Sequence, residues 1–404
     1  MTFAQTAPAD APPPPPPAPP AETVAPSTGT MNPPPPAEAP PPAPAPPSAV
    51  EAAPKPPTAA ETMPATRPDA LPPIDVGAWL RIGGKFQGKD ASKINDWQMD
   101  NTYVELHAGG KVHKNVGVTL NLNANVTSFS NMSAALEDAI ISFDFIDEFH
   151  LWAGHLLVPV DRANASGPFF MIPWNYPGFF SGAFVGAPAE GPSGRNNGAV
   201  IWGDIAGGKF SYFAGAFDNA AGLSTSPLFS GKLRLALWDP EPGFWGNASY
   251  FGDKDMLSID LGGQVQKNGV NATTNYEDVN VDVLVEKKLG GGSFATLEAA
   301  YYHFNQVSGG VSDSMYALLA YATPTVGIGN IQPMVRFQWE KVKDNPDTNP
   351  WNLDVGLSYL IKGPALRLLA TYSYTKLLNV DTTTMSLSNS TANSIQLGAQ
   401  AIFF

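Results

Sequence analysis

Charged side chains of both signs gather in one long connection between predicted strands. The segment 158–197 contains Asp161, Arg162, Glu190 and Arg195 among many aromatic residues. Carboxylates and guanidinium groups at a narrow passage replace part of an ion's hydration shell, and their sign decides which ions are favoured. We therefore interpret these four residues as candidates for a pore constriction. The alternative for Asp161 and Arg162 is a structural pair that holds the base of the connection.

A second set of charged residues lies on predicted strands, at positions that alternate with apolar ones. These residues are Arg81, Lys85, Asp282, Arg336, Glu340, Asp354 and Arg367. Because successive strand residues point to opposite faces, all of them lie on the polar face of their strands. We interpret them as candidates for a pore wall. The alternative for each is a solvated interior residue without a specific role.

Motifs for catalysis or metal binding are absent from the sequence. There is no cysteine, no G-x-S-x-G motif, no Walker loop and no dinucleotide fingerprint. His150 and His155 flank one strand, but no carboxylate lies at ligand spacing from them. We expect no cofactor, no metal and no enzyme activity. An outer-membrane hydrolase would need only one serine and one histidine close in space, so an enzyme of this kind would leave no sequence motif to recognise.

The elements that position the charged residues are predicted to be β-strands. Segments such as 116–126, 279–286, 351–362 and 366–375 alternate apolar and polar residues with a period of two. Nearly every segment has one apolar and one polar face, and no helical stretch covers the apolar faces. This pattern predicts a transmembrane β-barrel with apolar residues facing lipid and a polar, water-filled interior.

The folded domain is predicted to span residues 75–404. Counting 244–251 as a strand gives 17 strands, whereas treating 239–255 as one extended turn gives 16 and places every long connection at one end. We predict an all-β, 16-stranded antiparallel transmembrane barrel. The connection 158–197 is then the third outer loop, and it is expected to fold into the barrel because its aromatic rings need a surface to pack on.

Residues 1–74 are predicted to be a separate, disordered periplasmic segment. They hold 27 of the 41 prolines and cannot bury enough apolar surface to fold. In polyproline II form, about 70 residues at ~3.1 Å each extend to on the order of 200 Å. One hypothesis is a contact with peptidoglycan or a periplasmic partner, and the alternative is an unspecific spacer. Residues 1–10 show no secretory signal, so we interpret the chain as a mature or re-started form of an exported protein.

Charge and aromatic residues narrow the partners further. The formal net charge is −13, which argues against nucleic acid because such partners need a basic stripe. Aromatic residues near strand ends predict girdles at the two membrane interfaces, and a sugar-stacking path in the pore is the alternative. The girdle candidates are Trp79, Trp202, Tyr321, Trp339, Trp351, Tyr359 and Tyr372.

Two stretches resemble a known family. Leu156 to Pro168 (LLVPVDRANASGP) and Asp239 to Gly243 (DPEPG) are similar to stretches of the phosphate-selective porin O/P family, and the terminal Phe404 resembles the assembly signal of outer-membrane barrels. The resemblance covers residues 75–404. It implies a 16-stranded, homotrimeric channel in a Gram-negative outer membrane, in contact with lipid and lipopolysaccharide, whose third outer loop folds inward.

The sequence departs from this family in its charges. Anion-selective members are expected to line the pore with a ladder of basic residues, but few Arg and Lys occupy polar faces here. We therefore expect a passive diffusion channel for small hydrophilic solutes and ions that is general or weakly cation-favouring. The alternatives are a phosphate or anion-selective channel, and a structural protein that tethers the membrane to the cell wall through its Pro-rich tail.

Overall fold

The computed structural model describes most of the predicted barrel domain. The described residues are 74–87, 96–128, 131–178, 194–218, 226–271, 273–305, 310–344, 349–381 and 386–403. The Pro-rich segment 1–73, the constriction candidate Glu190 and the terminal Phe404 lie outside these residues.

Sixteen strands make up the fold. They are β1 (Asp75–Gln87), β2 (Asp96–His113), β3 (Val116–Ser128), β4 (Asn131–Ile146), β5 (Phe149–Leu157), β6 (Arg195–Ile205), β7 (Phe210–Phe217), β8 (Leu228–Ala236), β9 (Met256–Asn271), β10 (Thr274–Gly290), β11 (Ser293–Phe304), β12 (Val311–Ala322), β13 (Asn330–Val342), β14 (Trp351–Lys362), β15 (Leu366–Asp381) and β16 (Ser386–Phe403).

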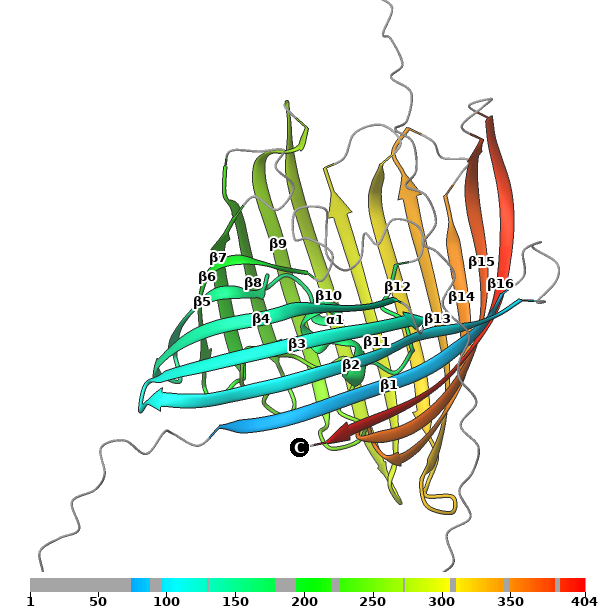
Figure 1. Cartoon of the computed structure of the whole chain (residues 1–404), viewed down its shortest axis with the longest axis horizontal. Coiled ribbons are helices and arrows are strands. Elements are labelled where there is room, and N and C mark those ends of the chain that lie inside the picture. Colours follow the sequence, from blue (N-terminus) through cyan, green and yellow to red (C-terminus); the bar gives the residue numbers. More distant parts are fainter. Residues whose placement is uncertain are drawn as a thin grey trace, which may run out of the picture. The chain divides into compact units, whose positions relative to one another are not determined.

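The strands close into one antiparallel barrel (Figure 1). Each strand pairs with its sequence neighbours, and β1 pairs with β16, with Ala78 opposite Phe403. The predicted count of 16 is confirmed, because the stretch 239–255 between β8 and β9 forms no strand. Closure leaves no sheet edge with unpaired backbone groups, which a bilayer requires.

The two faces of the barrel have opposite polarity. Along β9, Ser258, Asp260 and Gln264 are buried inside, whereas Ile259 and Leu261 are 38% and 51% exposed on the outside. The same alternation continues through β10 to β14. An outer surface of exposed Leu, Val and Ile is unfavourable in water and favourable against lipid, which confirms the predicted apolar exterior.

The extended turn predicted over 239–255 is present and enters the barrel. The stretch between β8 and β9 lies at the end of the barrel where the other connections are short, yet it covers residues 237–255. It turns into the barrel, where Phe244 is 3% exposed and contacts the rings of Trp152, Trp202 and Phe213. This is the extended turn that the count of 16 strands required.

The barrel interior is partly apolar. Residues of the connection after β5, including Val158, Val160 and Ala163, pack against inward-facing Trp202 and Phe213 in one buried cluster. Trp202, a predicted girdle residue, thus belongs to the interior, and so does Trp79, whose ring meets Phe169 and Phe170 of the same connection. The period-two alternation identified the inward face of the strands. It could not predict that an apolar loop packs on that face.

Short helices shape the connection that follows β5. The helix α1 (Arg162–Ser166) is capped by the Asp161 carboxylate, which accepts the Asn164 backbone N–H at 2.6 Å. A 3-10 turn, η1 (Pro168–Phe170), follows. Figure 1 shows α1 within the ring of strands. Within the described ranges, no helix is long and apolar enough to cross a membrane.

Candidate pore constriction

The described part of the connection after β5, residues 158–178, crosses the barrel interior and is called the inward segment below. Its close approach to the wall depends on glycine at two places. The Val160 carbonyl lies where a Cβ of Gly262 on β9 would be. Further along, the Trp174 ring covers the paired Gly83 and Gly398 of β1 and β16, and a Cβ on Gly83 would lie 2.8 Å from it. Both contacts bring the segment directly onto the backbone of the wall.

Three predicted wall residues bind the inward segment itself. Arg81, Arg336 and Arg367, on β1, β13 and β15, each donate a hydrogen bond to one of its backbone carbonyls. The acceptors are the carbonyls of Trp174 (2.6 Å), Asn175 (2.8 Å) and Ile172 (3.2 Å), respectively. Arg81 also stacks over the Trp174 ring, with its guanidinium carbon 3.8 Å from the ring centroid. These arginines therefore position the inward segment, because buried carbonyls need donors in a folded chain.

Arg162 anchors the other end of the inward segment. It donates to both carboxylate oxygens of Glu241 at 2.7 and 2.9 Å, to Asp260 at 2.8 Å and to Asp282 at 3.3 Å. The Ser258 hydroxyl accepts a further bond at 2.6 Å. The side chain of Arg162 is fully buried. It therefore joins the inward segment to β9, to β10 and to the connection 237–255.

Charge in this cluster is nearly balanced. Lys232 and Arg234 of β8 lie 3.8 and 3.5 Å from Asp260, so three basic groups face the three carboxylates of Glu241, Asp260 and Asp282. Burial alone raises the pKa of Glu241, but the guanidinium groups of Arg162 and Arg234 outweigh it and hold this pKa well below its usual range.

Asp161 lies beside this cluster. It is 3% exposed, and burial raises its pKa to about 7 despite the hydrogen bond from the Asn164 backbone. Its side chain caps α1, so its visible role is to shape the base of the inward segment.

An acidic group faces the inward segment from β2 and β4. Arg195 forms ion pairs with Glu137 at 3.1 Å and Asp138 at 3.3 Å. The Tyr103 hydroxyl donates to Glu137 at 3.0 Å and to Glu105 at 3.2 Å. Two carboxyl groups thus pair with one guanidinium, and Tyr103 joins a third, that of Glu105, to Glu137. The group is net negative even when one carboxyl carries a proton. We call these four charged residues the acidic group.

A β-bulge explains why two neighbouring carboxylates point inward. In the pairing of β3 with β4, Asn121 lies opposite Asp138 and Leu122 opposite Leu136, which leaves Glu137 as the extra residue. A bulge breaks strict alternation and re-aims side chains. Glu137 and Asp138 are consequently both buried, at 6% and 0% exposure.

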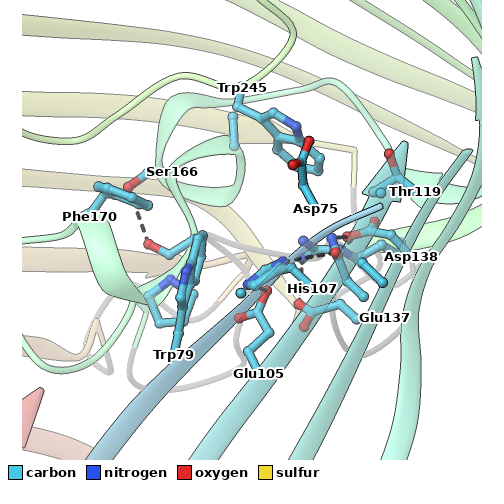
Figure 2. Close-up of a pocket in the computed structure, with 18 of the residues that line it drawn as sticks. Asp75, Trp79, Glu105, His107, Thr119, Glu137, Asp138, Ser166, Phe170 and Trp245 are labelled. Atoms are coloured by element: carbon cyan, nitrogen blue, oxygen red, sulfur yellow. Dashed lines mark hydrogen bonds and ion pairs between the residues drawn. The ribbon is translucent and has the colours of Figure 1, made fainter. Parts of the chain in front are cut away.

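Two cavities lie on either side of the inward segment. The larger, of about 610 Å³, is lined by the acidic group, by β1 to β4 and by residues 165–170 (Figure 2). The smaller, of about 320 Å³, is lined by Lys85, Tyr176, Arg336 and Asp354 among others. Burial raises the pKa of the Tyr176 hydroxyl, and the nearby carboxylate of Glu137 acts in the same direction. Tyr176 itself lines the smaller cavity.

The remaining constriction and wall candidates from the sequence lie in different parts of the barrel. Arg195 is the first residue of β6 and does not belong to the connection. Asp282 binds Arg162, and Asp354 binds Arg336 at 2.8 Å. Glu340 is buried on the inward face of β13, and Lys85 borders the smaller cavity.

Several polar residues of the interior were missed by the sequence reading. Glu105, Glu137, Asp138, Glu241 and Asp260 all take part in the clusters above. Glu105 and Asp260 could have been found from the alternation on their own strands, because they occupy the same alternate positions as other inward-facing residues. Glu241 lies in a connection and Glu137 in a bulge, so neither followed a strand pattern. Among the described residues, no group of three His, Asp or Glu could hold a metal ion.

Solved structures share this fold. The chain resembles OprB of Pseudomonas putida (TM-score 0.58, 10% identity, covering 82% of this chain and 94% of that one). It also resembles the anion-selective porin from Comamonas acidovorans (0.55, 14%, 82% and 100%). A third similar structure is OmpT, an outer-membrane protein of Vibrio cholerae, in a trimer form (0.51, 11%, 82% and 100%). At such identities the likeness establishes the fold alone.

Sequence comparisons add no family. No protein-family model matches the chain, and no curated protein matches it significantly. The resemblance to the phosphate-selective porin O/P family is not confirmed and stays a prediction.

Proposed function

We propose that the chain is an outer-membrane porin, a passive diffusion channel for small hydrophilic solutes and ions in a Gram-negative outer membrane. The observation that carries the proposal is a closed 16-stranded barrel with an apolar exterior, crossed inside by a segment with a cavity on each side. The similar structures include proteins named as porins. No catalytic role is proposed for any residue.

Selectivity is proposed to arise at an eyelet between the inward segment and the wall of β1 to β4. Tyr176 stands on one side, and Glu105, Glu137 and Arg195 stand on the other. An excess of carboxyl groups there favours cations weakly. Asp161 and Arg162, together with Asp282, are proposed to fix the base of the segment.

The wall residues divide between the two cavities. Lys85, Arg336 and Asp354 border the smaller one, which we propose to be the outer vestibule. Arg81 and Arg367 donate to carbonyls of the inward segment, so they position it and do not form a ladder for anions. This argues against the anion-selective alternative.

Solute uptake tests the channel function. Liposomes that contain the purified full-length chain should swell in isotonic arabinose and more slowly in larger sugars, because the eyelet sieves by size. Liposomes without protein and liposomes with heat-denatured protein serve as controls. Swelling no faster than in these controls would reject a diffusion channel.

A structural role is the second candidate, and the filled interior favours it. The inward segment and the connection 237–255 meet inside the barrel through the Arg162 cluster and an apolar core. In this reading the barrel is closed, and the Pro-rich segment 1–74 joins the membrane to peptidoglycan or a periplasmic partner. Deleting residues 1–70 should then release the barrel from purified cell-wall sacculi, and unchanged association would sink the tether.

Assembly and orientation complete the proposal. We propose a homotrimer in contact with outer-membrane lipid and lipopolysaccharide, because one similar structure is described as a trimer form. The ends of β1 and β16 that pair Ala78 with Phe403 are proposed to face the periplasm, as does the segment 1–74.

A further inference from the structure

We propose that the 610 Å³ cavity binds amphipathic organic cations that carry a flat aromatic ring. The cavity lies between β1 to β4 and the α1–η1 part of the inward segment (Figure 2). Its volume falls within the range of small-molecule sites, which combine apolar walls with a few polar groups that orient the ligand. Passage of such a cation through the barrel rests on the proposed channel function, but binding of the cation in the cavity does not.

Aromatic side chains from three separate parts of the chain line this cavity. Trp79 comes from β1, Phe170 from η1 and Trp245 from the connection 237–255. The rings of Trp79 and Phe170 meet edge to face, with centroids 5.5 Å apart. Trp245 is 37% exposed, and the guanidinium carbon of Arg195 lies 5.9 Å from its ring centroid. The exposed part of this ring is therefore the part that a ligand can contact. Indole rings attract both flat apolar rings and cations, since their faces carry negative electrostatic potential.

Carboxyl groups form the polar part of the same cavity. Glu105, Glu137 and Asp138 all line it, and Figure 2 shows them beside His107. Arg195 balances one negative charge, which leaves the group net negative. His107 lies 3.3 Å from Glu105, with its other ring nitrogen 2.8 Å from the Asn121 side chain.

The combination of walls and charge selects one ligand class. An anion with a ring would meet the same indoles but would be repelled by the carboxyl groups. A small inorganic cation would meet the carboxyl groups but has no flat apolar surface to stack on Trp79, Phe170 and Trp245. Only a molecule with both features uses both parts of the cavity, because each contributes a separate attraction.

Calorimetric titration of the folded, full-length chain in a non-ionic detergent tests the proposal. The probe is 9-aminoacridine, a flat aromatic cation at neutral pH, and the same detergent without protein provides the blank. We expect saturable binding, about tenfold weaker for neutral acridine, which keeps the ring but lacks the charge. Equal affinity for acridine, or heat that matches the blank, would overturn the inference.

Variants assign the binding to this cavity. Glu137→Gln and Trp245→Ala should each weaken binding of 9-aminoacridine about tenfold. Glu277→Gln, a matched change on the outward face of β10, should leave it unchanged. Affinity that is insensitive to both cavity variants would place the probe elsewhere and reject the site.

The outcome for the channel is separate. Conductance without binding of the probe overturns this inference and leaves the porin function standing. Binding that depends on Glu137 and Trp245, in a barrel that does not conduct, supports the site and rejects the channel.

Discussion

At the residue scale, Arg162 joins three buried carboxylates from separate parts of the described chain. Its guanidinium faces Glu241, Asp260 and Asp282 with no exposure to water. Removing one partner of a buried ion cluster leaves the others uncompensated, which typically costs about 3–5 kcal/mol. We predict that Arg162→Met lowers the free energy of unfolding by roughly that amount, measured by urea unfolding in detergent and followed by tryptophan fluorescence.

An exposed ion pair provides the control for Arg162. Lys287 lies 2.6 Å from Asp255 and is 51% exposed. Solvated pairs contribute about 0–1 kcal/mol, so Lys287→Met should change the free energy of unfolding by less than about 1 kcal/mol. If both variants had equally small effects, the cluster around Arg162 would not be the anchor of the inward segment.

Asp161 predicts a pH dependence of stability. Its pKa is about 7 in the folded chain because of burial, against an ordinary value of 3.8. Between these values the folded state keeps a proton that the unfolded state has lost, so stability falls as pH rises from about 4 to about 7. Asp161→Asn keeps an oxygen that caps α1, but its amide does not titrate in this range. The variant therefore avoids the loss of stability and should become more stable than the wild type as pH rises.

The expected gain of this variant is on the order of 4 kcal/mol at pH 8 and near zero at pH 4. Urea unfolding of both proteins across this pH range measures it. Parallel stability curves would show that Asp161 does not titrate within this window.

At the element scale, the inward segment depends on backbone surfaces that lack side chains. A Cβ at Gly398 would collide with the Trp174 ring, whereas one at Gly231 would meet only the Phe213 carbonyl oxygen at 3.5 Å. We predict that Gly398→Ala loosens the segment and speeds chymotrypsin cleavage within 169–176 by at least about tenfold, since cleavage tracks local opening.

Gly231→Ala is the matched control and should be cut at the wild-type rate. The two digests are compared on the folded protein in detergent, with cleavage sites assigned by mass spectrometry. Equal rates for both variants would mean that Trp174 does not hold the segment on the wall.

Elements also show where sequence reasoning succeeded and failed. Alternation in β9 and β10 predicted the inward and outward faces because strand geometry fixes a period of two. The same rule could not find Glu137, which a bulge turns inward, or Glu241, which enters from a connection. It also could not foresee that Arg81 and Arg367 bind loop carbonyls, since partners distant in sequence depend on tertiary packing.

At the scale of the whole molecule, the sequence predicted the closure of the sheet and the inward fold of the connection after β5, but not the entry of the connection 237–255 into the barrel. The sequence has sixteen alternating segments and no second sheet to cover their apolar faces. A barrel whose apolar faces meet the membrane is the fold that satisfies both conditions. The interior depends on how two connections, 158–178 and 237–255, fold together around Arg162. Their residues follow no simple period, so the contacts between the two connections required the structure.

The measurement that tests the central proposal most directly is the reversal potential of the full-length protein in a planar bilayer under a KCl gradient. A passive channel with the acidic group at its eyelet should give steady open steps and a potential that favours potassium over chloride. Glu137→Gln combined with Glu105→Gln should move that potential towards zero, since the carboxyl excess is gone. A chloride-favouring potential in the wild type, or no conductance from the folded barrel, would contradict the account.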